Sequence, residues 1–202
     1  MKNKIIMKSA ELFSNLGFKS VTMDDIANEM GISKKTIYQY FATKTKLVEA
    51  TAIFKFECIS ESIDDIFKLE ANPIDELFNT KDFIISHMKN QKLSIEYQFK
   101  KYYPKIYSIV KQKQFEAMNK CVCDNLNRGI QAGLYRTNLN VDFISRIYFS
   151  AMGSMKDNEI FPSDKFNLEE SLTHYLEYHL RGICTPLGIT YLNERTQQSK
   201  IK

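Results

Sequence analysis

The sequence predicts an all-α protein, and three observations support this fold class. Only 7 glycines and 4 prolines occur among the 202 residues, which leaves little material for turns. Helix-forming Lys, Glu, Leu and Ile are abundant, and apolar residues recur at intervals of three and four. The same composition argues against an all-β protein and against a parallel nucleotide-binding sheet.

The first expected helix ends at Gly17. Ile6, Ala10 and Phe13 form its apolar stripe, and glycine accepts the left-handed backbone that often closes a helix. A second, short helix is expected to begin after Thr22. Its N-cap hydroxyl precedes Asp25 by three residues, an arrangement close to a capping box.

The second helix ends at Gly31, and Ser33 is the N-cap of a third helix over residues 34–41. Ile37 and Phe41 are expected to turn inward. Two short helices joined by a three-to-four-residue turn with a glycine form a helix-turn-helix unit. The side chains that this third helix directs outward are Lys34, Lys35, Thr36, Tyr38, Gln39 and Tyr40.

Charge is concentrated in this first quarter of the chain. Residues 1–46 hold eight lysines and four acidic residues, whereas the remainder holds 20 basic and 20 acidic residues. A small basic unit on a neutral body suggests contact with a polyanion, either nucleic acid or an anionic membrane. A lysine-rich face that only serves solubility is the alternative.

Helical spacing, caps and charge coincide in one stretch, from Ile6 to Leu47. The helical spacing, the caps and the outward polar face depend on Ala10, Phe13, Gly17, Thr22, Ile26, Ala27, Gly31, Ser33, Thr36, Ile37, Tyr38, Tyr40, Phe41 and Lys44. This stretch resembles the N-terminal domain of the tetracycline-repressor (TetR) family. The resemblance implies a helix-turn-helix DNA-binding domain over residues 1–46 and a larger helical ligand-binding and dimerisation domain over residues 47–202.

The resemblance also implies individual roles. It assigns DNA-backbone contacts to Thr22, Tyr38, Tyr40 and Lys44, and base contacts to Lys34, Lys35 and Thr36. With Ser33 and Gln39 added, the expected DNA-binding residues are Thr22, Ser33, Lys34, Lys35, Thr36, Tyr38, Gln39, Tyr40 and Lys44. Asp24 departs from the family pattern and is left out, because a carboxylate next to DNA repels phosphate.

Further helices are expected beyond residue 44. An amphipathic segment runs to about Leu69 and is broken by Asn72 and Pro73. A helix follows over residues 73–89, then an irregular aromatic patch, then a long helix from near Pro104 to Gly133.

The last two expected helices carry apolar residues at alternating intervals of three and four, the spacing of a four-helix bundle. Together with a twofold partner they predict a dimer interface formed by Val141, Ile144, Tyr148, Ala151, Met155, Leu172, Leu176, His179 and Ile183. On spacing alone these residues could equally seal the monomer core, and the family resemblance favours the dimer. Asn167 is the expected N-cap of the second helix, with Glu170 at the third helical position.

The aromatic patch has two interpretations. Its rings alternate with lysines, as on a platform for single-stranded nucleic acid, but Pro104 interrupts it, which favours a helix junction with the rings packed inward. By resemblance to the family, the central helices enclose an inducer. The candidate pocket residues are Phe83, His87, Tyr103, Tyr107, Phe115, Met118 and Met152.

Catalytic, metal and cofactor sites are not expected. The chain has no Gly-rich phosphate loop, no serine nucleophile between glycines and no His-Glu zinc helix. Its four cysteines are expected to be reduced, and Cys121 and Cys123 point to different sides of a helix. No signal peptide or membrane span is apparent, which indicates a cytoplasmic protein.

The sequence therefore predicts a homodimeric transcriptional regulator, most simply a repressor, that binds palindromic double-stranded operator DNA and is released by a small-molecule inducer. The alternative is a ligand-free helical adaptor whose basic head binds DNA non-specifically or an acidic protein partner.

Overall fold

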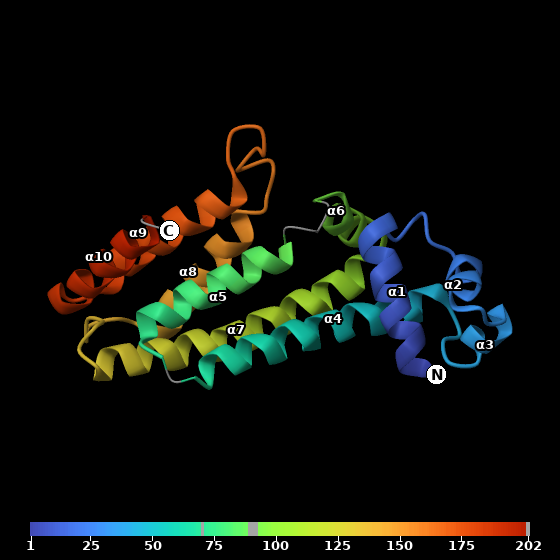
Figure 1. Cartoon of the computed structure of the whole chain (residues 1–202), viewed down its shortest axis with the longest axis horizontal. Helices are drawn as coiled ribbons and strands as arrows, with labels where there is room; N and C mark the ends of the chain where they lie inside the picture. Colours follow the sequence, from blue (N-terminus) through green and yellow to red (C-terminus); the bar gives the residue numbers. More distant parts are fainter. Residues whose placement is uncertain (70, 89–92, 201–202) are drawn as a thin grey trace. The chain divides into compact units, whose positions relative to one another are not determined.

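The computed structural model describes residues 1–69, 71–88 and 93–200, and in these ranges the chain is helical (Figure 1). The all-α prediction is confirmed. The helices are α1 (Lys2–Leu16), α2 (Met23–Met30), α3 (Lys34–Tyr38), α4 (Lys44–Phe67), α5 (Pro73–Met88), α6 (Leu93–Tyr102), α7 (Pro104–Gln131), α8 (Val141–Ser154), α9 (Leu168–Ile183) and α10 (Pro186–Lys200).

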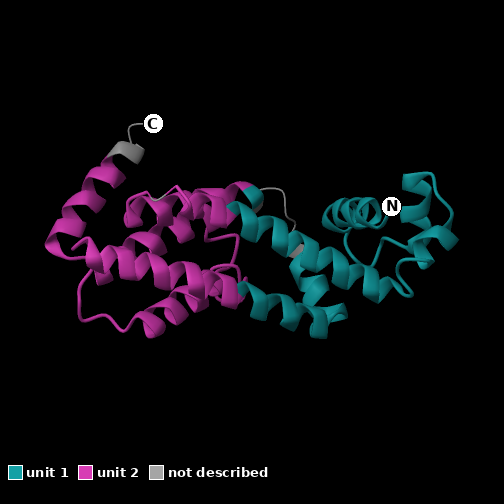
Figure 2. Cartoon of the chain, turned by 90° about the horizontal axis from the view of Figure 1, so that it is seen from below, with its two compact units in different colours: residues 1–62, 87–114 teal, residues 63–86, 115–202 magenta. Residues whose placement is uncertain are grey.

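The described chain forms two compact units (Figure 2). Unit 1 contains Met1–Ser62 and His87–Gln114, and unit 2 contains Ile63–Ser86 and Phe115–Lys202. Each boundary falls within a helix, namely α4, α5 or α7. The units are defined by packing, whereas the expected division after residue 46 concerns function, and that division stays a prediction.

Unit 1 is built on one hydrophobic cluster to which the first four helices all contribute. Their most buried side chains, each at most 1% exposed, are Ile5, Phe13, Ile26, Ile37, Leu47 and Val48. Ile37 is the only buried residue of the five-residue α3. Because so short a helix is unstable by itself, its position depends on this contact and on the caps at its ends.

Local caps set the ends of α2. The Thr22 hydroxyl accepts a hydrogen bond from the Asp25 backbone N–H at 3.2 Å, and the Asp25 carboxylate accepts one from the Thr22 N–H at 2.7 Å. This reciprocal pair is a capping box, as the spacing of Thr22 and Asp25 in the sequence suggested. The pKa of Asp25 is lowered, first by that backbone hydrogen bond and then by one from the Thr22 hydroxyl. Gly31 ends the helix with φ 63° and ψ 32°, in the left-handed region.

Replacing Gly31 by alanine should destabilise the α2–α3 turn by about 1 kcal/mol, because a Cβ disfavours the left-handed conformation. No atom lies within 4 Å of the added carbon, so the loss is conformational rather than steric. Hydrogen exchange of the α2 and α3 amides should speed up about fivefold. Gly31→Asn, which tolerates this backbone better, is the control, and an equally large effect of Asn would contradict the explanation.

The structure differs from the expected elements at three places. The segment expected to be irregular is the helix α6, and the third helix ends at Tyr38 rather than Phe41. The chain also has a helix after α9, namely α10, which begins at Pro186. Proline is favoured at the first position of a helix, where its missing N–H costs nothing. Pro186 therefore limits α9 and begins the next helix.

The aromatic patch lies on α6 and at the start of α7. Phe99 stacks on Phe18 with ring centroids 5.1 Å apart, and Tyr103 meets the same ring edge-on at 5.8 Å. Tyr97 and Tyr102 remain exposed, with the Lys101 ammonium over both rings. The inward packing expected of a helix junction is thus found for part of the patch.

Unit 2 has its own core, in which α5, α7, α8, α9 and α10 take part. A buried polar group lies within it. The Glu76 carboxylate, 0% exposed, accepts hydrogen bonds from Asn125 Nδ2 at 2.8 Å and from Arg128, and the Tyr135 hydroxyl donates to Asn125 Oδ1 at 3.2 Å. This polar cluster joins α5 to α7 inside an otherwise apolar interior.

Candidate nucleic-acid interface

The surface of α3 is the candidate site, because burial of Ile37 turns its neighbours to solvent. Seven of the nine expected DNA-binding residues are exposed, namely Thr22, Ser33, Lys34, Lys35, Tyr38, Gln39 and Tyr40. Thr36 and Lys44 are partly buried. The structure thus brings a short polar face together at the end of unit 1 where α2 and α3 are neighbours (Figure 1).

Local bonds already occupy the hydroxyls of this face. Ser33 Oγ accepts a hydrogen bond from the Thr36 backbone N–H at 3.1 Å and lies 2.8 Å from Thr36 Oγ1. Thr22 Oγ1 donates to Asp25 at 2.8 Å. Each hydroxyl oxygen keeps acceptor capacity, and each helix start presents backbone N–H groups, the arrangement that binds phosphate.

Two lysines open α3, and their surroundings differ. Lys34 Nζ forms a salt bridge with Asp24 Oδ2 at 2.7 Å, which links the first turn of α3 to the first turn of α2. The hydrogen bond to Asp24 raises the pKa of Lys34. Lys35 is exposed and has no ion-pair partner within the described part of the chain. Asp24 is not among the expected DNA-binding residues, because a carboxylate repels phosphate, and its contact with Lys34, ten residues further along the chain, is visible only in the structure.

The Lys44 side chain serves the fold as well as the surface. Its ammonium donates to the Phe18 carbonyl at 2.6 Å and lies over the Phe13 ring. Partial burial lowers the pKa of Lys44, against a smaller opposing effect of Asp25. An ammonium has three donors, so this carbonyl leaves capacity for a phosphate, and the expected backbone contact stays a prediction.

Tyr38 and Tyr40 flank the end of α3 and are each 43% exposed. A phenol hydroxyl donates to phosphate without adding charge, so these rings suit positioning contacts with a DNA backbone. Together with the lysines they form a hydrogen-bonding face on and just beyond α3, and a major groove is wide enough to admit an α-helix.

The residues expected at a dimer interface lie in or against the core of unit 2, and their role in a dimer stays a prediction. Five of them are buried in the core of their own chain: Tyr148, Leu172, Leu176, His179 and Ile183. Val141, Ile144, Ala151 and Met155 are half-buried against the same core. The five buried side chains have little area left for a second copy, whereas the four half-buried ones keep part of theirs. The large apolar residues that α8 and α9 leave exposed are Phe143, Ile147 and Tyr178.

The seven candidate pocket residues do not form one cluster within either unit. His87, Tyr103 and Tyr107 belong to unit 1, whereas Phe83, Phe115, Met118 and Met152 belong to unit 2. Phe115 packs edge-on against Phe149 at 5.2 Å, and Tyr107 packs against Phe99 at 5.8 Å. An inducer pocket at these positions remains a prediction.

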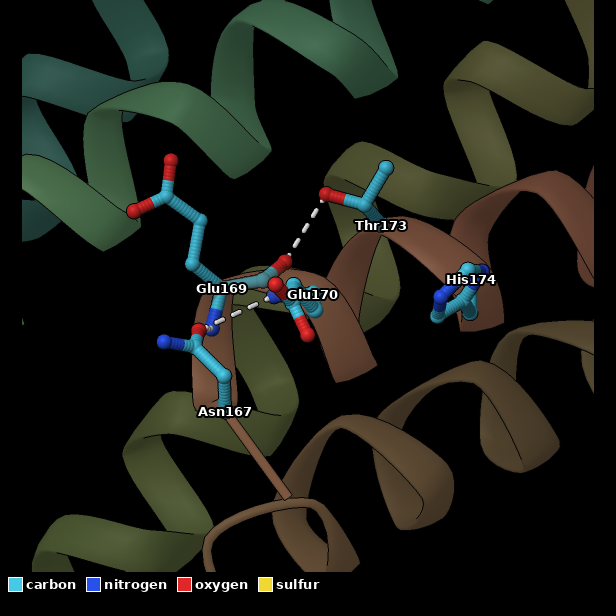
Figure 3. Close-up of a pocket in the computed structure, with 5 residues that line it drawn as sticks. All are labelled: Asn167, Glu169, Glu170, Thr173 and His174. Atoms are coloured by element: carbon cyan, nitrogen blue, oxygen red, sulfur yellow. Dashed lines mark hydrogen bonds between the residues drawn. The ribbon is translucent and has the colours of Figure 1, made fainter. Parts of the chain in front are cut away.

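Two surface hollows of unit 2 contain none of these seven residues. One, of about 370 Å³, is lined by Asn167, Glu169, Glu170, Thr173 and His174 (Figure 3). Its polar atoms serve the start of α9: Asn167 Oδ1 accepts from the Glu169 and Glu170 N–H groups, and Thr173 donates to the Glu169 carbonyl. The expected N-cap at Asn167 is confirmed. The other hollow, of about 710 Å³, lies between the α4–α5 turn and α7.

Neither a membrane-spanning helix nor a metal site is present within the described ranges. No helix there is both long and apolar enough to cross a membrane. Within the same ranges, no three His, Cys, Asp or Glu residues are grouped so that they could hold a metal ion.

Comparison with known proteins places the site in context. Residues 5–51 match the family model described as bacterial regulatory proteins, tetR family. The chain is 24% identical over 148 residues to the HTH-type transcriptional repressor KstR2 of Mycobacterium tuberculosis, covering 72% of this chain and 74% of that one. It is 25% identical over 194 residues to the HTH-type transcriptional regulator YvaF of Bacillus subtilis, covering 91% and 95%.

Solved structures agree on the fold. A TetR transcription regulator from Haloarcula marismortui superposes with a TM-score of 0.75 at 19% identity, covering 91% of this chain and 98% of that one. A transcriptional regulator from Cytophaga hutchinsonii gives a TM-score of 0.74 at 19% identity, with the same coverage. The matched residues 5–51 include every residue of the α3 face described above.

Proposed function

Because this chain is a bacterial regulatory protein of the tetR family, a family of DNA-binding transcription factors and not of enzymes, we propose that it represses transcription by binding a palindromic operator as a homodimer. The observation that carries the proposal is the exposed polar face of α3, held on the buried Ile37 inside the family-matched segment. Such an activity belongs in the cytoplasm, with the DNA.

In this proposal α3 enters the major groove. Lys34, Lys35 and Thr36 contact base edges, and Thr22, Tyr38, Tyr40 and Lys44 contact the backbone, with Ser33 and Gln39 completing the surface. Lysine donates to guanine O6 and N7, whereas the tyrosines and the helix start position the unit on phosphates. The excess of lysine over acidic residues in residues 1–46 supports the approach to DNA.

A selection of random DNA duplexes by the purified protein at physiological salt tests the proposal. We expect recovery of a palindrome whose half-sites lie about 34 Å apart or a multiple of this spacing, as two symmetric reading helices require. Recovery of duplexes without any enriched sequence would refute operator recognition and would support the adaptor with a non-specific basic head.

Replacing Lys35 by alanine should weaken binding to the selected operator by about 1–3 kcal/mol, roughly 5- to 150-fold, because a base contact is lost. Binding to random duplex should fall only slightly. Competition binding of the two DNAs measures both numbers. Lys4→Ala removes the same charge from α1 and serves as control; equal losses for the two variants on both DNAs would contradict a base contact by Lys35.

We place the dimer interface of this proposal on the exposed sides of α8 and α9. Phe143 and Ile147 lie one helical turn apart and are 57% and 44% exposed, and Tyr178 on α9 is 76% exposed. Large apolar side chains exposed on neighbouring helices are typical of a surface that a partner covers. A second copy supplies the same two helices and completes a four-helix bundle.

Ile147→Glu should raise the dimer dissociation constant at least tenfold, because the twofold axis brings buried carboxylates into the interface. Sedimentation equilibrium measures the constant. Ile109→Glu is the matched control: Ile109 is an isoleucine of unit 1 with 43% exposure. If the two variants dimerise equally well, the interface lies elsewhere.

Release by an inducer is the remaining part of the proposal. In it, a small molecule held among the central helices shifts α4, which begins in the core of unit 1 with Leu47 and Val48 buried. The operator is released only if the molecule prefers the conformation that binds DNA poorly. Titration of candidate apolar ligands into the operator complex tests this step.

A further inference from the structure

The salt bridge between Asp24 and Lys34 lies on the proposed DNA-binding surface. Asp24 is on the first turn of α2 and Lys34 on the first turn of α3, and their side chains are 58% and 47% exposed. An exposed pair of this kind adds little to stability. Because the salt bridge involves Lys34, which is expected to contact a base, its role is better sought in DNA binding than in stability.

The neighbouring lysine provides the contrast. Lys35 adds a full positive charge to the surface, whereas Lys34 and Asp24 together add none. Their 2.7 Å contact also fixes where the Lys34 ammonium lies, although a lysine side chain is otherwise free to sample many rotamers. Of the two adjacent lysines, one is therefore neutralised and held in place.

This difference matters when DNA approaches. A phosphate that binds the Lys34 ammonium meets a second anion, because the Asp24 carboxylate lies 2.7 Å from the same ammonium and repels it. To bind a guanine edge, the ammonium can keep one hydrogen bond to Asp24 and donate its other two to O6 and N7. The pair therefore disfavours non-specific contact and leaves base contact open.

We propose that Asp24 is a specificity-determining positioning residue, which holds the Lys34 ammonium for a guanine edge and withholds it from phosphates. This inference rests on the proposed function, since it requires an operator that α3 reads. It gives Asp24 a role at a position where sequence reasoning saw only repulsion of DNA.

Four variants test the inference: Asp24→Asn, Lys34→Ala, the double variant, and Asp24→Glu. Asp24→Asn should tighten binding to random duplex about fivefold at low salt and steepen the slope of log K against log salt by about 0.9, one phosphate contact. Operator affinity should change less than twofold, so the ratio of operator to random affinity falls about fivefold. Asp24→Glu should restore the ratio, because it restores the carboxylate.

Two controls separate positioning from simple charge. In the Lys34→Ala background, Asp24→Asn should change the ratio less than twofold, because there is no ammonium left to hold. Glu29→Gln removes a carboxylate from the same helix, one that pairs with Lys8 at 3.5 Å and is 55% exposed, and it too should leave the ratio unchanged. Circular dichroism of each variant confirms that the helices are intact.

The outcomes are distinct. A ratio that Asp24→Asn leaves unchanged, or that falls equally with and without Lys34, overturns the inference while the operator proposal stands. A wild-type protein that binds operator candidates and random duplex equally refutes the proposed function itself, before any variant is compared.

Discussion

Replacing Arg128 by alanine should lower the free energy of unfolding of unit 2 by about 3–5 kcal/mol, the cost of leaving a buried charge without its partner. Glu76 is fully buried, and Arg128 and Asn125 are the groups seen to donate to its carboxylate. Removal of Arg128 leaves Asn125 as the donor. Urea-induced unfolding followed by far-UV circular dichroism measures the loss.

A second substitution distinguishes this explanation from a loss of packing. Glu76→Gln in the Arg128→Ala background removes the unpaired charge at nearly constant volume and should restore part of the lost stability. Arg146→Ala breaks an exposed pair with Asp142, in which the side chains are 57% and 64% exposed, and should cost less than about 1 kcal/mol. A similar loss from both arginine variants would contradict the role of burial.

The stability of the protein should also fall as the pH is lowered from about 6.5 to about 4, because His179 is buried without charge. Burial lowers the pKa of His179 from 6.5 to about 4. Its Nε2 has no hydrogen-bond partner within the described residues, and its ring lies 5.0 Å from that of Tyr148 and 5.9 Å from that of Tyr175. Burial raises the pKa of both tyrosines, so neither changes charge in this range.

The sign follows from proton binding. Between these pH values the unfolded chain binds a proton at this histidine and the folded chain does not, so acid favours unfolding. Stability is complete above about pH 6.5, and the loss reaches about 3 kcal/mol near pH 4. Because carboxylates titrate as well, the measured quantity is the difference between wild type and His179→Leu, by urea unfolding at each pH.

The exposed His174 on the same helix provides the control. His174→Gln should keep the wild-type dependence on pH, whereas His179→Leu should remove most of the slope between pH 6.5 and pH 4. If the two variants show the same slope, the dependence arises at other groups.

Elements whose ends depend on nearby residues were predictable from the sequence. Thr22 and Asp25 cap α2 across three residues, and Asn167 does the same for α9, so their signals lie within one turn. The helix α6 carried no regular apolar stripe, and the contact of Phe99 with Phe18 joins residues far apart in the chain. The helix α10 was not predicted, because a proline such as Pro186 indicates the end of one helix as readily as the start of the next.

The site shows the same limit. The exposed face of α3 followed from the inward position of Ile37, which helical spacing reveals. Spacing could not reveal the salt bridge of Asp24 with Lys34, which forms across the turn between two helices. It also identified the buried side of α8 and α9 without indicating what covers it, since a chain's own core and a partner impose the same pattern. Leu172 and Leu176 are buried by other residues of their own chain.

The five-residue helix α3 has one further consequence, for how the protein can change over evolutionary time. Ile37 alone anchors it in the core, whereas Lys34, Lys35 and Tyr38 are exposed. Substitutions at exposed positions usually change stability by less than about 0.5 kcal/mol. Duplicated copies of such a gene can therefore acquire new target sequences by changing these side chains, while the fold that presents them is inherited intact.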